Sequence, residues 1–120
     1  MAGGRVRLEQ DWFFRYLTAD ESSIDALSRD VYARAYWTAD AIRAGNAWYQ
    51  AFPQDILDEG HYTKLTMPVM GIAAPGYDWV KTRLAAKATS FEMVKVEGSG
   101  HFIPEEKPQV LIDNLKRFLQ

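Results

Sequence analysis

Two strand-like segments in the second half of the chain limit what it can fold into more than any other feature. One is the continuous apolar run Pro68–Ala74, and the other is Phe91–Val96, which follows after a stretch of helical length. A short continuous apolar run such as the first is typical of a parallel strand that is covered on both faces. With a helix over residues 77–87 and an apolar-faced helix over residues 107–119, they predict a parallel βαβα unit of the α/β class.

The first half of the chain contains no strand pattern and predicts three helices. Apolar residues recur at helical spacing over residues 5–17 and 24–35. Thr38 can cap a third helix over residues 39–52, which Pro53 is expected to end, and residues 55–59 can add one more turn before Gly60. We therefore expect a helical segment over residues 1–60 and an α/β segment over residues 61–120. The apolar face of the second helix is expected to consist of Ile24, Leu27, Val31, Tyr32 and Ala35.

The composition is that of a globular protein and excludes several classes of function. The chain has 120 residues, 48% of them hydrophobic and 25% charged, with a net charge of −2 and no cysteine. This balance argues against a nucleic-acid partner or an anionic membrane surface, and the lack of cysteine excludes disulfides and thiolate metal sites. Because no apolar run is long enough to span a membrane or to act as a signal peptide, the expected location is cytoplasmic.

The number of predicted strands is too small for a complete sheet. A parallel pair needs neighbouring strands at both edges as well as helices on both faces. Only two strands are predicted, so the pattern is expected to be the end of a larger sheet. An open edge of this kind also favours pairing with a second copy of the chain.

The residues most suited to chemistry lie just after the second strand. His101 is placed on a glycine-flanked loop directly before a helix, and loops at the carboxyl ends of parallel strands are where α/β sheets collect catalytic groups. From the residues alone, His101 is either a catalytic base or a histidine that only ties down its loop. The neighbouring Glu105, Glu106 and Lys107 are expected to be an ordinary helix start. Since His61 and His101 lie far apart without further ligands, no metal is expected.

The amino-acid sequence of this loop resembles that of a known family. Gly-Ser-Gly-His-Phe-Ile-Pro-Glu-Glu-Lys-Pro over residues 98–108 resembles the C-terminal signature of α/β-hydrolases, in which this histidine is the catalytic base. Residues 65–72 are similar to the penultimate strand of that core. Residues 11–15 and 46–52 resemble lid helices of the epoxide hydrolase and haloacetate dehalogenase branch. The resemblance covers nearly the whole chain and implies the C-terminal portion of an α/β-hydrolase fold, with lid helices before the last strands.

The resemblance also implies roles for Tyr49 and Asp78. Tyr49 matches a lid tyrosine that donates a hydrogen bond to an epoxide oxygen or helps to bind a leaving halide. A phenol suits this work because it stays protonated at neutral pH, and the alternative is a packing residue with its hydroxyl at the surface. Asp78 is the candidate acid that orients His101. Its alternative is a first-turn helix residue favoured by the helix dipole, with the true acid outside the chain.

The attacking group of the family is missing from the sequence. In the family it lies on an elbow, Gly-x-Ser-x-Gly or Gly-x-Asp-x-Gly, and neither pattern occurs in these residues. The first hypothesis is therefore the C-terminal part of an epoxide hydrolase-like enzyme without cofactor. It would be inactive alone, and would act on a small-molecule epoxide, halide or ester when its N-terminal half is supplied. The second is a non-catalytic truncated descendant that oligomerises, and the third is a self-contained hydrolase with Asp78 as nucleophile.

Overall fold

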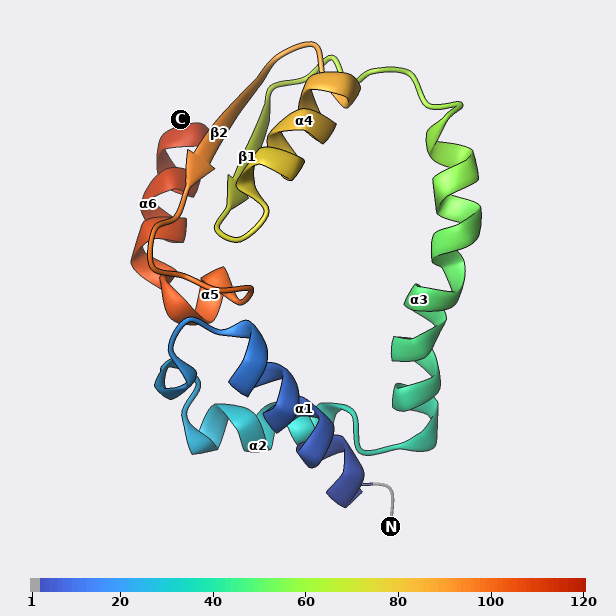
Figure 1. Ribbon diagram of the computed structural model, residues 1–120, viewed down its shortest axis with the longest axis vertical. Coiled ribbons are helices and arrows are strands. Elements are labelled where there is room, and N and C mark those ends of the chain that lie inside the picture. The colour runs from blue at the N-terminus through green and yellow to red at the C-terminus, as the bar shows by residue number, and fades with distance from the viewer. Residues whose placement is uncertain (1–2) are drawn as a thin grey trace. The chain divides into compact units, whose positions relative to one another are not determined.

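The computed structural model describes residues 3–120, which form two compact units (Figure 1). The first unit extends through Tyr16 and resumes over Ile24–Tyr62. The second consists of Leu17–Ser23 together with Thr63–Gln120. The chain therefore enters the second unit briefly, returns to the first, and then completes the second.

Three helices make up the first unit, as the sequence predicts. They are α1 (Gly3–Leu17), α2 (Ala26–Ala35) and α3 (Ala39–Glu59). Side-chain caps define two of the starts: Asp25 accepts from the Ser28 N–H at 2.7 Å, and Thr38 accepts from the Ala41 N–H at 3.1 Å. These bonds satisfy N–H groups that have no partner within the helix. The bond from the Ser28 N–H is also the largest cause of a lowered pKa at Asp25.

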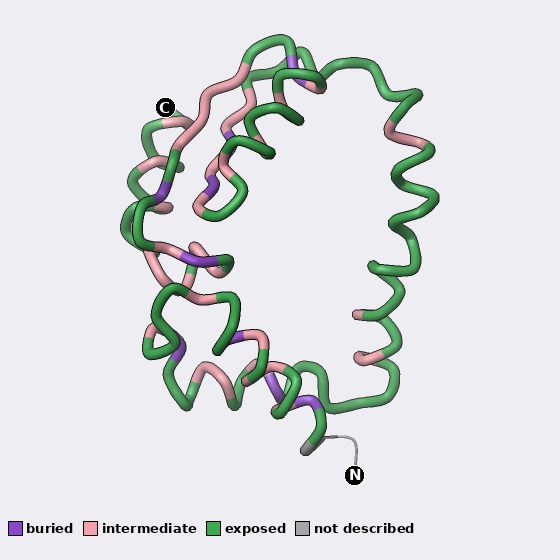
Figure 2. Tube along the Cα trace, in the orientation of Figure 1, coloured by how far each residue is buried: buried purple, intermediate pink, exposed green. Residues whose placement is uncertain are grey.

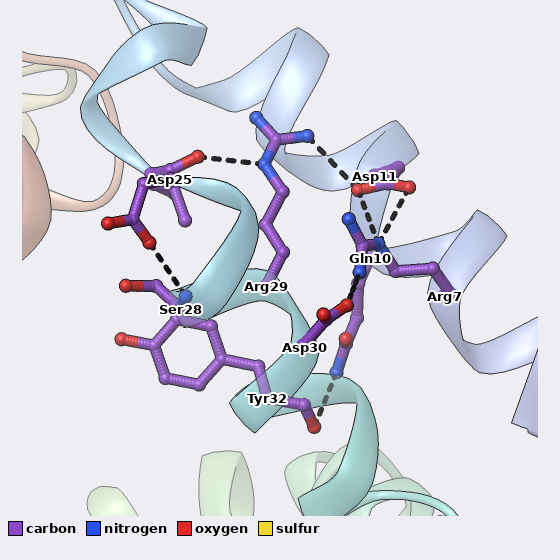
Figure 3. A network of polar contacts seen from close by, with 9 residues as sticks. Arg7, Gln10, Asp11, Asp25, Ser28, Arg29, Asp30 and Tyr32 are labelled. Carbon is purple, nitrogen blue, oxygen red and sulfur yellow. Dashed lines mark hydrogen bonds and ion pairs between the residues drawn. The ribbon is translucent and has the colours of Figure 1, made fainter.

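A polar network joins α1 to α2 (Figure 3). The Asp11 carboxylate accepts from Arg7 Nε at 2.9 Å and from Arg29 Nη1 at 3.0 Å, and Arg7 also pairs with Asp30. The hydrogen bond to Asp11 is the largest cause of a raised pKa at Arg7. Arg29 also lies over the Phe14 ring, 5.2 Å from its centroid, so this side chain contributes both charge and packing. The buried apolar side chains of this unit are Val6, Phe14, Ile24 and Ala33.

The predicted apolar face of α2 is partly wrong. Ile24 is buried, but Leu27 and Val31 are 70% and 49% exposed. The buried position on α2 is instead Ala33, which shares a helix face with Arg29 because the two are four residues apart. The ion pairs to α1 therefore turn this face inward, and periodicity of apolar residues alone could not reveal them.

The predicted end of α3 at Pro53 is also wrong, because the helix continues through Pro53 to Glu59. Proline lacks the N–H that would bond to the Tyr49 carbonyl, yet its fixed φ is compatible with a helix. The surrounding side chains Tyr49 and Phe52 are exposed, so water can satisfy the freed carbonyl at limited cost.

The second unit contains the parallel βαβα unit that the sequence predicts. Strand β1 (Val69–Ala73) pairs in parallel with β2 (Phe91–Lys95), with Gly71 opposite Met93, and α4 (Tyr77–Lys87) connects them. The short α5 (Ile103–Glu106) and then α6 (Pro108–Phe118) follow. A leading 3-10 turn, η1 (Glu21–Ser23), belongs to the same unit.

The two long helices of this unit lie on opposite faces of the strand pair. A Cβ on Gly71 would lie 2.5 Å from Met93 Sδ and 2.6 Å from Leu84 Cδ1, so α4 covers this face. The residue that precedes Met93 on β2 points to the other face. It is Glu92, whose carboxylate binds Arg117 of α6 at 2.8 Å. This bidentate contact lowers the pKa of Glu92 and raises that of Arg117.

The strand pair is open at its edges within the described residues, since the sheet contains β1 and β2 alone there. This confirms the prediction of an incomplete sheet. The strands are less covered than their apolar character predicts: Gly71 and Ala73 are buried, while every other strand residue is half-buried or exposed (Figure 2). None of the described helices is both long and apolar enough to cross a membrane.

Candidate functional site

The loop that carries His101 continues directly from β2. The Val96 N–H donates to the Ala73 carbonyl at 2.9 Å, so the ladder extends one residue past the strand. Gly98 then adopts φ +66°, a left-handed conformation that favours glycine. This turn brings His101 to the carboxyl edge of the parallel pair, where the sequence predicted it.

The backbone of His101 is held, while its ring is exposed. Its N–H donates to the Leu17 carbonyl at 2.7 Å. The imidazole meets the Phe102 ring edge-on, with 5.1 Å between centroids and an interplanar angle of 87°. Neither ring nitrogen forms a hydrogen bond with any residue in the range 3–120. The ring is therefore accessible for proton transfer.

Gly100 and Glu106 fix the loop beside the histidine. The Glu106 carboxylate accepts from the backbone N–H groups of Gly100 at 2.9 Å, Phe102 at 3.1 Å and Ala19 at 2.6 Å. A helix does begin here, and the first turn of α5 contains Glu105 and Glu106. The expectation of ordinary charge placement is wrong for Glu106, because its side chain bonds back to the loop. Sequence patterns gave no signal for this role, because Ala19 is 87 positions away.

Asp78 lies at the same edge of the strand pair, in the first turn of α4 after Gly76. Its carboxylate is exposed, and its negative charge is a minor cause of a raised pKa at Lys95, behind the hydrogen bond from Lys95 to Glu97. Across the described residues, Asp78 and His101 form no hydrogen bond with each other. The structure therefore brings both groups to one edge without joining them.

Tyr49 belongs to the first unit, in the middle of α3. Its side chain is 68% exposed, and its ring lies 5.4 Å from that of Phe52. Trp48 beside it is also exposed. The hydroxyl is thus available to a ligand. Over residues 3–120, no group of three His, Cys, Asp or Glu side chains could hold a metal ion.

Comparisons with known proteins agree with this architecture. No family model matches the chain. A soluble epoxide hydrolase from Corynebacterium sp. (strain C12) is 33% identical over 90 residues, which are 72% of this chain and 32% of that protein. The crystal structure of Cfl2 from Burkholderia cenocepacia matches 98% of this chain and 42% of its own, with TM-score 0.89 and 31% identity. The epoxide hydrolase CorEH matches 97% of this chain and 44% of its own, with TM-score 0.79 and 25% identity.

These similarities confirm the fold that the sequence resemblance implies. The chain has the fold of the C-terminal portion of an α/β-hydrolase. Its relatives are epoxide hydrolase-like α/β-hydrolases. The chain spans about a third of the length of the curated relative and less than half of each solved structure.

Proposed function

We propose that this chain supplies the cap and the C-terminal core of an epoxide hydrolase-like enzyme, with His101 as the base. The single observation that carries the proposal is the His101 loop. It has a fixed backbone and an exposed ring without hydrogen bonds to described residues, at the carboxyl edge of the parallel pair. Similarity to an epoxide hydrolase over 72% of the chain supports the same reaction class.

The reaction would proceed in two steps. A carboxylate nucleophile on an elbow motif that does not occur in this sequence attacks an epoxide carbon, the C–O bond breaks, and an ester and an alkoxide form. His101 then takes a proton from water, the resulting hydroxide attacks the ester carbonyl carbon, and the ester C–O bond breaks to regenerate the carboxylate. The proton held by His101 and the proton of the added hydroxyl pass to the two alkoxide oxygens, which gives the diol. With a halide substrate, the carboxylate would displace a halide ion as the C–halogen bond breaks, and hydrolysis of the ester would release an alcohol.

Tyr49 would act in the first step. Its O–H would donate a hydrogen bond to the epoxide oxygen and stabilise the developing alkoxide. The exposure of this side chain on α3 supports the assignment. Asp78 would act in the second step as the acid that orients His101, and its position at the same strand edge supports this.

The domain organisation follows from this assignment. Residues 1–60 would form the cap, and residues 61–120 the end of the core. A compact helical unit that extends to Tyr62 supports the boundary. The open edge of β1 would pair with a strand from the missing N-terminal half, so the isolated chain should be inactive.

A chimera tests the proposal most directly. The N-terminal part of the Corynebacterium relative that precedes the matched region would be joined ahead of this chain. We expect the chimera to hydrolyse styrene oxide, and its His101→Gln variant to accumulate an enzyme whose mass is increased by one styrene oxide. His61→Gln is the matched control, since the chain contains two histidines. Full turnover by the His101→Gln chimera would refute the role of the base.

Further variants of the chimera separate the other roles. Tyr49→Phe should slow ester formation about a hundredfold, which is typical of losing one donor to a developing oxyanion. Asp78→Asn should slow ester hydrolysis more than about tenfold and leave ester formation unchanged. An unchanged rate of ester hydrolysis in Asp78→Asn would contradict the proposal that Asp78 orients His101. Asp78 would then be only a first-turn helix residue.

The open sheet edge also supports a second candidate function, a non-catalytic module that oligomerises. Both outer edges of the β1–β2 pair are free of strands within residues 3–120, and such edges favour pairing between copies. Native mass spectrometry of the isolated chain distinguishes the two. A stable dimer supports this candidate, and a folded monomer contradicts it.

A further inference from the structure

We propose that Glu106 is a positioning residue that fixes the backbone on both sides of His101 and ties this loop to the strap, Leu17–Ala19. The inference rests on the proposed function, in which His101 is the base. It concerns a carboxylate that the sequence treated as part of a helix start. All the contacts that support it lie within the second unit.

The two carboxylate oxygens of Glu106 divide three donors between them. Oε2 accepts from Ala19 N at 2.6 Å and from Gly100 N at 2.9 Å, while Oε1 accepts from Phe102 N at 3.1 Å. An ionised carboxylate is a pure acceptor with room for about four such bonds, and charge-assisted bonds are about twice as strong as neutral ones. The backbone of Glu106 adds a further contact, since its N–H donates to the Phe102 carbonyl at 3.0 Å.

The strap completes the arrangement from the other side. The His101 N–H donates to the Leu17 carbonyl at 2.7 Å. The N–H groups of Gly100, His101 and Phe102 are therefore all engaged, alternately by Glu106 and by the strap. With three consecutive residues fixed in a loop, the direction of the His101 Cα–Cβ bond is fixed as well. The Phe102 ring then limits where the imidazole can turn.

Close contact as well as hydrogen bonding holds the strap. A Cβ on Gly100 would lie 2.6 Å from Ala19 N and 2.7 Å from the Thr18 carbonyl carbon. Directly after the strap, the Asp20 carboxylate accepts from Ser22 N at 2.9 Å and Ser22 Oγ at 2.7 Å. These bonds lower the pKa of Asp20. The contacts at Gly100 show that the histidine loop packs directly against the strap.

A second acidic residue close to the histidine, Glu97, makes a different contact. Glu97 lies on the same loop, but its carboxylate pairs with Lys95 Nζ at 2.8 Å and its side chain is 78% exposed. Replacing Glu97 by glutamine removes the same charge from the same loop without touching Gly100, Phe102 or the strap. Glu97→Gln is therefore the matched control.

Amide hydrogen exchange of the ¹⁵N-labelled 120-residue chain tests the proposal without any catalytic assay. In Glu106→Ala, exchange at Ala19, Gly100 and Phe102 should accelerate about ten- to hundredfold, as expected for loss of a charged hydrogen bond. In Glu106→Gln, one side-chain oxygen remains as the acceptor for Ala19 N and Gly100 N. The amide NH₂ takes the place of the other oxygen and cannot accept from Phe102 N. Protection should therefore persist at Ala19 and Gly100 and be lost at Phe102. Glu97→Gln should leave all three amides unchanged.

The orientation of the imidazole gives a readout that a purely structural role would not move. Three-bond couplings of His101 should report one side-chain rotamer in the wild type and rotamer averaging in Glu106→Ala, while the His61 couplings stay constant. Gly100→Ala provides a second route to the same result, because it displaces the strap while leaving the bond from Phe102 to Glu106 in place. Unchanged amides at Met93 and Ile72 would show that the strand pair is intact.

Two results would overturn the inference. One is unchanged exchange at all three amides in Glu106→Ala, and the other is an unchanged His101 rotamer despite their loss of protection. Neither result bears on the His101→Gln chimera, which tests the proposed function separately.

Discussion

Replacing Gly98 or Gly100 by alanine distinguishes two physical reasons for a glycine in the histidine loop. Gly98 has φ +66°, and an added Cβ would meet Lys107 Cε and Nζ at 3.9 Å, which is ordinary contact. Gly98→Ala should therefore lower the free energy of unfolding only through backbone conformation, by about 1 kcal/mol for a side chain in the left-handed region. Gly98→Asn should recover part of this loss, since asparagine tolerates that region better.

Gly100→Ala should cost more, for a steric reason. The added Cβ would lie 2.6 Å from Ala19 N, so the strap must move away from the loop. Two bonds would then be lost: His101 N–H to the Leu17 carbonyl, and Ala19 N–H to Glu106. One neutral and one charged hydrogen bond together contribute about 2–4 kcal/mol. Gly100→Ala should therefore destabilise the chain at least about twice as much as Gly98→Ala.

Urea unfolding followed by far-UV circular dichroism measures both effects. The order of midpoints should be wild type, then Gly98→Ala, then Gly100→Ala, with equal slopes for all three chains. A Gly100→Ala midpoint at or above that of Gly98→Ala would refute the view that contact with the strap, rather than backbone conformation, requires glycine at residue 100.

Three further perturbations test the rest of the fold. Arg117 lowers the pKa of Glu92 below its ordinary value of 4.5, so this pair contributes stability that is complete above pH 4.5 and is lost as pH falls through the lowered pKa. Arg117→Gln should flatten that part of the pH profile of the urea midpoint. Pro53→Ala restores a helical N–H within α3 and should increase far-UV helicity and stability, by up to about 3 kcal/mol. Arg29→Met keeps an apolar stem on α2 but removes the ion pair with Asp11. It should lower the free energy of unfolding, measured by urea, by about 1 kcal/mol.

Each of these three has a control or a contradicting result. For Arg29→Met the control is Arg43→Met, whose pair with Asp40 is highly exposed and should contribute little. Equal losses in the two variants would contradict the role of the network between α1 and α2. An unchanged pH profile in Arg117→Gln, or lower helicity in Pro53→Ala, would contradict the other two predictions.

Local sequence signals predicted the elements whose determinants lie close together in the chain. The apolar run before Pro75 and the turn at Gly76 gave β1 and the start of α4 almost to the residue. Pro53 was misleading because a proline penalty is a local rule, whereas the helix on both sides of it is long enough to absorb one missing bond. The apolar pattern of α2 was misleading because the ion pair from Arg29 to Asp11 of α1 decides which face of α2 is buried.

The candidate site follows the same division. The position of the His101 loop between β2 and α5 could be predicted because the strand, the loop and the following helix are contiguous in sequence. Glu106 could not, because the donors it serves come from both its own loop and the strap. The link from Asp78 to His101 was a prediction from position, and position at one strand edge does not by itself create a hydrogen bond.

The brief excursion of Leu17–Ser23 into the second unit has a practical and evolutionary consequence. A polypeptide cut to residues 61–120 would retain both strands and the imidazole, but it would lose the acceptor at Leu17 and the donor at Ala19. Insertions or deletions near the end of α1 would disturb the backbone of a loop encoded more than 80 positions downstream. If His101 is the base, as proposed, its position would then depend on a stretch of the gene that encodes no reacting group.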